Sequence, residues 1–162
     1  MSRWKEKSQP SSPYITAEGY RQLEQEYRRL WVTREEVRQA VAAAAAEGDR
    51  SENAEYIYRK KQLREIDRRI TWLQKRLPKL KVVREIISGE QVFFSAWVEL
   101  EKEDGSLVKF RIVGPDELGN DESWISVDSP LARALLGKKV DNEVTINTKS
   151  GKVTYIIVSI SY

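Results

Sequence analysis

The chain has 162 residues, of which 40% are hydrophobic and 33% are charged, a composition typical of a globular or coiled-coil protein. It contains no cysteine and no histidine, which excludes disulfides, zinc sites built on those residues, cysteine nucleophiles and histidine general bases. Any catalysis must therefore use carboxylates, lysine, tyrosine, serine or threonine, or groups supplied by a partner.

The net charge of +3 hides an asymmetry along the chain. Residues 1–87 contain 20 basic and 13 acidic side chains, whereas residues 88–162 contain 8 and 12. This division predicts two parts with different partners. No apolar run approaches the roughly 20 residues that cross a bilayer, and the N-terminus has no apolar signal-peptide core, so we expect a cytoplasmic protein without a membrane partner.

Residues 1–14, with two prolines and several serines, predict a flexible tail. The following segment predicts two long helices. Thr16 is a favoured N-cap, and apolar side chains recur every three or four residues from 20 to 44, interrupted by Arg34. The same spacing returns between 56 and 80, after Gly48. These seams predict an antiparallel coiled-coil hairpin over residues 15–84, a finger with arms about 45 Å long.

The pattern changes after Pro78, which is expected to end or kink the second helix near Leu77. Residues 88–162 alternate apolar and polar side chains between turn sequences, as β-strands do. Ser129 as N-cap, Pro130 at the first helical position and Gly137 beyond the end predict one short helix. The fold class is therefore α+β, a helical hairpin followed by a small, mostly antiparallel sheet with one short helix.

The predicted turn of the hairpin contains Asp49 and Glu52. One interpretation is a capping box, with Asp49 as N-cap and Glu52 at the third helical position. The other is a pair of exposed carboxylates that bind a hard cation such as Mg²⁺. Because two carboxylates alone bind Mg²⁺ weakly, another molecule would have to complete the coordination shell.

The second predicted helix is strongly basic. Residues 56–84 contain eleven lysines and arginines against Glu65 and Asp67. A solvated face normally mixes the two signs of charge, so we favour a phosphate-binding stripe for nucleic acid over an ordinary exposed face. Tyr56 and Tyr58 are the nearby stacking candidates, too few to support base-specific readout. The stripe consists of Arg59, Lys60, Lys61, Arg64, Arg68 and Arg69.

Three segments carry a resemblance to a known family: GDRSENAEYIYRKKQLREIDRRI at 48–70, FRIVG at 110–114 and SVDSPLARALLGKKV at 126–140. They resemble the bacterial transcript cleavage factors of the GreA/GreB family, and the GreB branch more closely. The resemblance implies an FKBP-like C-terminal domain. It also implies an accessory factor, not itself an enzyme, that inserts its finger into the secondary channel of RNA polymerase and stimulates the polymerase's own cleavage of backtracked RNA.

The resemblance also implies roles for individual residues. Asp49 and Glu52 match the tip acids that complete a Mg²⁺ site of the polymerase, so no tightly bound cofactor is expected. The basic stripe would hold the extruded RNA 3′ segment. Three further residues match the tip motif and would shape the turn: Arg50, Ser51 and Asn53. Three residues match the segment that grips the polymerase, and helix capping is an alternative or additional role for them: Asp128, Ser129 and Pro130.

Two other functions remain open at this point. The first is a channel-binding inhibitor that blocks the polymerase without promoting cleavage, although such a plug needs no metal-completing pair of acids. The second is a prolyl isomerase, suggested only by the FKBP-like fold; against it, Trp97, Phe110 and Trp124 are expected to be core residues. We expect a monomer, because the apolar seam is satisfied within the hairpin.

Overall fold

The computed structural model describes residues 11–48, 52–84, 89–119 and 121–162. The chain forms two compact units: a helical unit, Glu18–Leu80, and a sheet unit that joins Met1–Ala17 to Lys81–Tyr162. The expected α+β arrangement of a helical hairpin followed by a small sheet with a short helix is confirmed.

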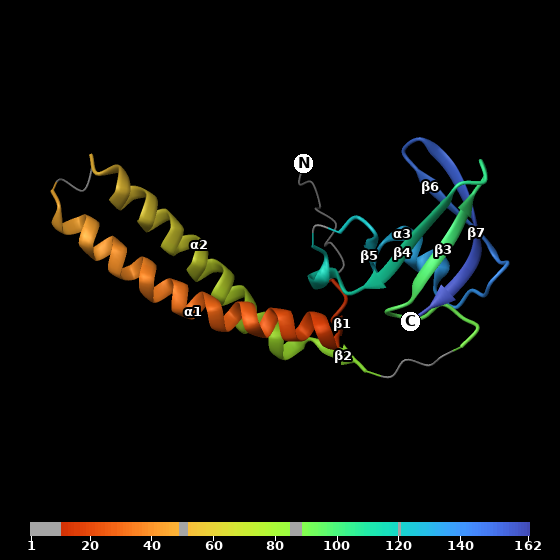
Figure 1. Ribbon diagram of the computed structural model, residues 1–162, viewed down its shortest axis with the longest axis horizontal. Coiled ribbons are helices and arrows are strands. Elements are labelled where there is room, and N and C mark those ends of the chain that lie inside the picture. The colour runs from red at the N-terminus through yellow and green to blue at the C-terminus, as the bar shows by residue number, and fades with distance from the viewer. Residues whose placement is uncertain (1–10, 49–51, 85–88, 120) are drawn as a thin grey trace, which may run out of the picture. The chain divides into compact units, whose positions relative to one another are not determined.

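The helical unit is an antiparallel pair of helices, α1 (Ala17–Ala46) and α2 (Ala54–Arg76), which run side by side (Figure 1). The predicted seam forms its core. Val37, Ile66 and Ile70 are buried together, and Tyr27, Leu30, Val41 and Leu63 pack against them. A 3₁₀ turn, η1 (Leu77–Lys79), follows α2, as expected where Pro78 lacks the backbone donor that would extend the helix.

Arg34, the charged residue in the seam of α1, is accommodated by a partner on α2. Its Nε donates to Oδ1 of Asp67 over 2.6 Å, and both side chains are partly exposed. The aliphatic stem of an arginine can cover apolar surface while its charged end stays near water. The interruption therefore becomes a cross-link between the helices rather than a break in the hairpin.

The larger sheet of the sheet unit has five strands in the order β5-β4-β3-β7-β6. Neighbours are antiparallel except for β4 and β5, which are parallel. A 3₁₀ turn, η2 (Pro115–Glu117), lies between β4 and β5, and the short helix α3 (Pro130–Leu135) lies between β5 and β6. The strands are β3 (Trp97–Lys102), β4 (Leu107–Val113), β5 (Trp124–Ser126), β6 (Glu143–Thr148) and β7 (Gly151–Ser161).

The core of this unit lies between one face of the sheet and α3. Leu100, Ile112 and Ile157 from the sheet are fully buried with Leu135 of α3. The helix starts as predicted: the Ser129 hydroxyl accepts a hydrogen bond from the backbone N–H of Ala132 over 3.2 Å, and Pro130 is the first helical residue.

The expectation that Trp97 and Trp124 belong to the core is wrong, whereas Phe110 does pack against it. Side chains alternate between the two faces of a strand, and because Val98 is buried in the core, Trp97 points to the opposite face. There the Arg111 guanidinium lies 5.9 Å from the ring centroid of Trp97 and 5.2 Å from that of Trp124. These contacts stabilise the rings outside the core.

Two short strands alter the predicted boundaries. β1 (Tyr14–Thr16) pairs in parallel with β2 (Lys81–Val83), and both belong to the sheet unit. Tyr14 is therefore not part of a flexible tail, and residues 15–17 and 81–84 do not belong to the helical unit. Residues 1–10 of the predicted tail lie outside the described residues.

A carboxylate holds β1 in place. Glu117 accepts hydrogen bonds from the backbone N–H of Thr16 (3.0 Å), from the Thr16 hydroxyl and from the backbone N–H of Gly114 (2.8 Å). Three donors around one carboxylate satisfy most of its acceptor capacity. Glu117 thus joins β1 to the segment that follows β4.

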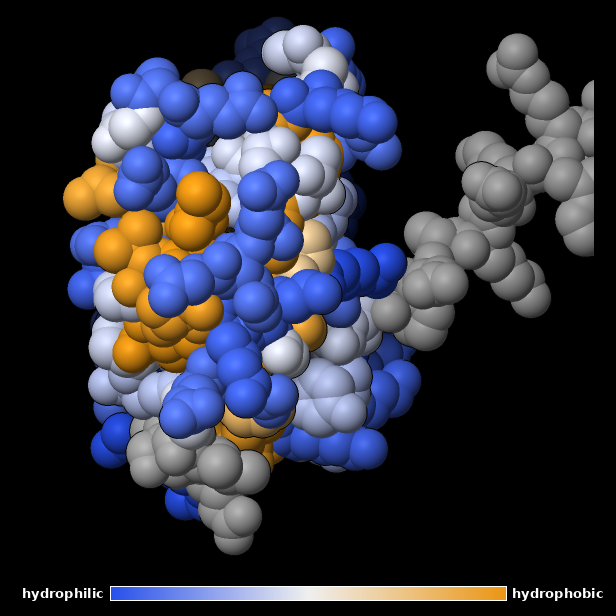
Figure 2. All heavy atoms as spheres, turned by 90° about the vertical axis from the view of Figure 1, so that its right-hand side faces the viewer, coloured by the Kyte–Doolittle hydropathy of each residue, from blue (hydrophilic) through white to orange (hydrophobic). Residues whose placement is uncertain are grey.

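Figure 2 shows that the surface of the sheet unit carries apolar side chains among hydrophilic ones. The exposed apolar side chains of this unit include Ile156 and Val158 of β7 and Val140, in the segment that leads into β6. That segment is ordered by backbone hydrogen bonds between Asp141 N and Ile157 O (2.8 Å) and between Ile157 N and Asn142 O (3.0 Å). Among the described residues, no helix is long and apolar enough to cross a membrane.

Candidate functional site

The tip of the hairpin is organised by Asn53. It is the N-cap of α2, with φ −85° and ψ 97°, and its Oδ1 accepts a hydrogen bond from the backbone N–H of Tyr56 over 3.0 Å. Its Nδ2 donates to the backbone carbonyl of Ala44 over 2.7 Å. One side chain therefore caps α2 and ties its start to the last turn of α1.

This cap contradicts one of the two predictions for the tip acids. Because α2 begins at Ala54, Glu52 precedes the N-cap and cannot occupy the third helical position. The capping-box interpretation of Asp49 and Glu52 is therefore wrong. The Glu52 side chain is exposed, while Asp49, Arg50 and Ser51 lie outside the described residues.

An open hollow of about 350 Å³ lies at the tip, lined by Glu47, Gly48, Glu52 and Asn53. Both ends of the Asn53 amide are used in hydrogen bonds, and the Glu47 and Glu52 side chains are exposed. Within the described part of the chain, no group of three or more acidic side chains could hold a metal ion. Of the two acids that match the family motif, Glu52 presents an exposed carboxylate of the kind that Mg²⁺ binds.

The role of Asn53 can be tested by two substitutions. Asn53→Ala removes both hydrogen bonds, and we expect it to lower the stability of the hairpin by about 1–2 kcal/mol, the usual cost of losing a cap. Asn53→Asp keeps the accepting oxygen but not the donor to Ala44, so its loss should be smaller. Thermal unfolding followed by circular dichroism at 222 nm measures both. Equal stability of Asn53→Ala and wild type would contradict the cap assignment.

The structure divides the basic stripe into two groups. Arg59 donates to Glu55 (2.7 Å) and to Gln62 (3.1 Å), and Arg69 donates twice to Glu26 (2.6 and 3.0 Å). The other four side chains are exposed, and none of them forms an ion pair with the residues that the structure describes; they are Lys60, Lys61, Arg64 and Arg68.

Part of this second group surrounds a hollow of about 250 Å³, lined by Lys61, Arg64, Glu65 and Arg68. Three cations against one carboxylate leave a local positive charge that favours an anion such as a phosphate. Three residues of the predicted stripe, Lys61, Arg64 and Arg68, therefore line this hollow. Lys60 is a fourth exposed cation of the stripe, and its Nζ lies 5.5 Å from the Tyr56 ring centroid.

Sequence analysis missed an exposed aromatic cluster on α1. The rings of Tyr27 and Trp31 meet edge to face with centroids 6.3 Å apart, and the Arg34 guanidinium lies 5.8 Å from the Trp31 centroid. Hydrogen bonds to Trp31 and then to Gln74 lower the pKa of the Tyr27 hydroxyl. The sequence could have indicated this exposed ring, because Trp31 lies outside the 3,4 seam of apolar residues and therefore on the surface of the hairpin.

A local ion pair also stabilises the middle of α1. Arg38 donates to both carboxylate oxygens of Glu35 over 3.0 and 2.7 Å, and this lowers the pKa of Glu35 from 4.5 to about 2. The ionised form is favoured in the helix, so the contribution is present above pH 4.5 and is lost as the pH falls towards 2. Since both side chains are exposed, the effect is small.

The structure assigns local roles to the segment expected to grip the polymerase. Ser129 caps α3, so the predicted capping role is confirmed for this residue. The Asp128 carboxylate accepts a hydrogen bond from the backbone N–H of Ser12 over 2.8 Å, and Pro130 is exposed. Sequence reasoning could not have paired residues 116 positions apart.

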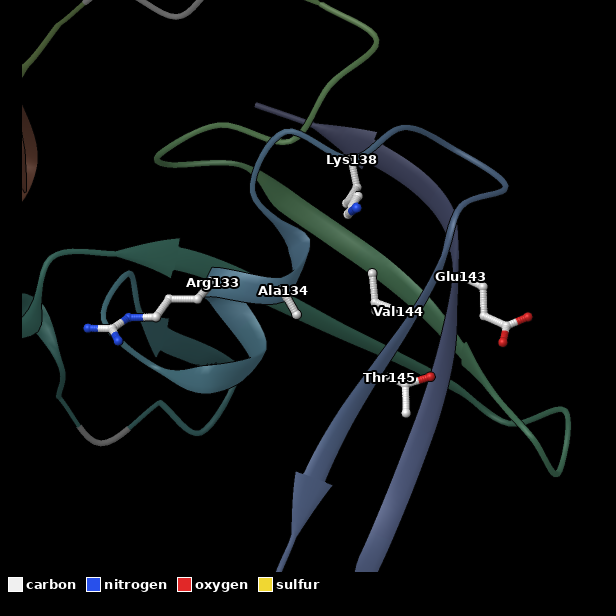
Figure 3. Close-up of a pocket in the computed structure, with 6 residues that line it drawn as sticks. All are labelled: Arg133, Ala134, Lys138, Glu143, Val144 and Thr145. Carbon is white, nitrogen blue, oxygen red and sulfur yellow. The ribbon is translucent and has the colours of Figure 1, made fainter.

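A further hollow of about 360 Å³ lies between α3 and β6 (Figure 3). Figure 3 shows that Arg133 and Glu143 extend away from it in opposite directions, while Ala134, Val144 and Thr145 lie between them. The charged groups do not converge, which a binding site for a polar ligand would require. The hairpin is therefore the stronger candidate.

Comparison with known proteins defines the class of protein. Residues 13–82 match the family described as "Transcription elongation factor, N-terminal", and residues 87–162 match "Transcription elongation factor, GreA/GreB, C-term". Together these matches span both units. The chain belongs to the GreA/GreB family of transcription elongation factors.

Individual relatives point to one branch of this family. The chain is 54% identical to transcription elongation factor GreB of Xanthomonas axonopodis pv. citri and 53% identical to that of Pseudomonas aeruginosa. In both cases the match covers 100% of this chain and 98% of the relative. Among solved structures, GreA factor homolog 1 (Gfh1) of Thermus thermophilus is 27% identical over 92% of this chain and 98% of its own, with a TM-score of 0.42, too low to support a structural argument.

Proposed function

We propose that this protein binds RNA polymerase in the cytoplasm as a monomer, inserts its hairpin into the secondary channel and stimulates the polymerase's own endonucleolytic cleavage of backtracked RNA. The observation that carries the proposal is the position of Glu52, exposed and outside the cap of α2. Its carboxylate has no capping task, in contrast to the neighbouring Asn53. An exposed carboxylate that does not cap a helix, at the end of a long hairpin, is suited to bind a group on another molecule.

Asp49 and Glu52 are the residues that we assign to the Mg²⁺ site of the polymerase, with Arg50 and Ser51 shaping the turn and Asn53 holding it. When bound, the ion would generate a nucleophilic hydroxide from water and stabilise the charge that develops on the phosphate. The residues of this chain would complete its shell and orient that water.

The basic stripe is the proposed contact for the extruded RNA. Lys60, Lys61, Arg64 and Arg68 are the stronger candidates, because Arg59 and Arg69 already pair with Glu55 and Glu26. Lysine and arginine bind the RNA backbone through phosphate charge, so this contact would not depend on sequence. Asp128, Ser129 and Pro130 of the sheet unit are the proposed contact with the polymerase surface.

Transcript cleavage by stalled, backtracked polymerase in Mg²⁺ tests this proposal. We expect the protein to shorten the 5′-labelled RNA faster than the polymerase does alone, and to restart elongation. If the protein binds the polymerase, slows elongation and leaves cleavage unchanged, it is instead an inhibitor that occupies the channel.

A further inference from the structure

One side of the hairpin combines positive charge with an exposed tryptophan. On α2, Lys60, Arg64, Asp67, Thr71 and Gln74 are spaced four, three, four and three residues apart, and side chains at this spacing share one face of a helix. On α1, Tyr27, Trp31 and Arg34 share a face for the same reason.

Two contacts join these faces. Arg34 donates to Asp67 over 2.6 Å, and Gln74 donates to the Tyr27 hydroxyl over 3.3 Å. Trp31 lies between Tyr27 and Arg34 along α1, so its ring lies between the two contacts. We call this surface the Trp31 side; it consists of Tyr27, Trp31 and Arg34 of α1 and Lys60, Arg64, Asp67, Thr71 and Gln74 of α2.

The charge of the Trp31 side suits a polyanion. Asp67 is neutralised by Arg34, whereas Lys60 and Arg64 form no ion pair within the described chain, and Arg68 follows Arg64 by one turn. On α1, the neighbouring Glu35 is paired with Arg38. This leaves Glu24, which lies one heptad before Trp31, as the remaining acidic side chain. Cations therefore outnumber anions along the Trp31 side.

The Trp31 ring offers a surface for stacking. It is 44% exposed, although an exposed indole is costly to leave in water. Tyr27 meets it edge to face and Arg34 lies near it, so two neighbours limit its movement. An exposed ring on the same side of a hairpin as unpaired cations is a combination by which proteins bind single-stranded nucleic acid without regard to sequence.

We infer that Trp31 stacks on a base of single-stranded RNA whose phosphates contact Lys60 and Arg64 of α2. The inference deepens the proposed function and rests on it for the identity of the RNA, the extruded 3′ segment. Trp31 lies 17 residues before Gly48, about 25 Å from the tip along the helix. RNA extruded by only a few nucleotides does not reach it, whereas a longer segment does.

Trp72 provides a matched control. It is 38% exposed and lies on α2 with the Arg69 guanidinium 4.6 Å from its ring centroid, and Arg69 pairs with Glu26 of α1. It thus resembles Trp31 in exposure and in its arginine neighbour. Arg69 follows Asp67 by two residues, and Trp72 follows Thr71 by one. Because residues at these spacings do not face each other on a helix, Arg69 and Trp72 lie on another face of α2 than Asp67 and Thr71.

The test is direct binding of the full chain to a labelled, unstructured RNA of about 12 nucleotides by fluorescence polarisation, without polymerase. We expect Trp31→Ala to weaken binding about tenfold, the effect of losing one stacked base, and Trp31→Phe and Trp72→Ala to bind nearly as wild type does. The salt dependence of binding should be unchanged in Trp31→Ala but shallower in Lys60→Gln with Arg64→Gln, because only the latter removes phosphate contacts.

Equal binding by Trp31→Ala and Trp72→Ala, or no RNA binding by the wild type, would overturn the inference. A loss of polymerase binding by Trp31→Ala with unchanged RNA binding would assign the ring to a protein contact and overturn it as well. The proposed function fails separately: RNA binding that depends on Trp31, together with no stimulation of cleavage in backtracked complexes, would leave the RNA contact standing and contradict the cleavage role.

Discussion

Asp49→Asn combined with Glu52→Gln should reduce stimulated RNA cleavage by at least about 100-fold while leaving polymerase binding within about twofold of wild type. Loss of groups that only support a metal ligand already costs about 10–100-fold, and here direct ligands of the shared Mg²⁺ are removed. Each substitution retains the size of the side chain and removes only its charge. The Glu52 side chain is exposed and does not belong to the hydrophobic core of the hairpin, so the fold should remain intact.

Glu47→Gln is the matched control for this experiment. Glu47 lines the same hollow as Glu52 and is also exposed, but it is not one of the two acids that match the family motif. We expect it to retain cleavage within a few fold of wild type. If Glu47→Gln lost as much activity as the double variant, the general negative charge of the tip would explain the effect, and the assignment of Asp49 and Glu52 as metal ligands would fail.

Gly114→Ala should destabilise the sheet unit by about 2 kcal/mol or more. A Cβ at residue 114 would lie 2.0 Å from the backbone oxygen of Tyr14 in β1 and 3.1 Å from a carboxylate oxygen of Glu117. Forcing extra atoms into a packed site typically costs 1–3 kcal/mol, and a backbone atom cannot turn aside as a flexible side chain can. We expect β1 to be displaced from its pairing with β2.

Gly119→Ala controls for this substitution, because a Cβ there has no neighbour within 4 Å. Thermal unfolding of both variants, with hydrogen exchange at Thr16 as a local measure, separates the two cases. Gly114→Ala should expose the Thr16 amide, which donates to Glu117 in the wild type, and Gly119→Ala should not. Unchanged stability and exchange in Gly114→Ala would contradict the close approach of β1 to residue 114.

The regular elements were predictable because their signals are local. The 3,4 spacing of apolar residues defines a buried stripe on each long helix, and Pro78 stops the second one through its own missing N–H. Likewise Ser129 and Pro130 specify the start of α3 within one turn. The predicted capping box at the tip was wrong because asparagine is as good an N-cap as aspartate, and propensity alone did not show that Asn53 takes the place expected for Asp49.

Sequence patterns alone predicted the hairpin, the alternating strands, the basic character of the second helix and the motifs that indicate the family. The contacts between distant residues came from the tertiary structure: the parallel pairing of Tyr14–Thr16 with Lys81–Val83, the hydrogen bonds of Glu117 to Thr16, and the contacts of Arg34 with Asp67 and of Tyr27 with Gln74 across the hairpin. Local spacing determines which face of an element a side chain occupies, but it carries no information about which element lies opposite, because that choice depends on packing the whole chain.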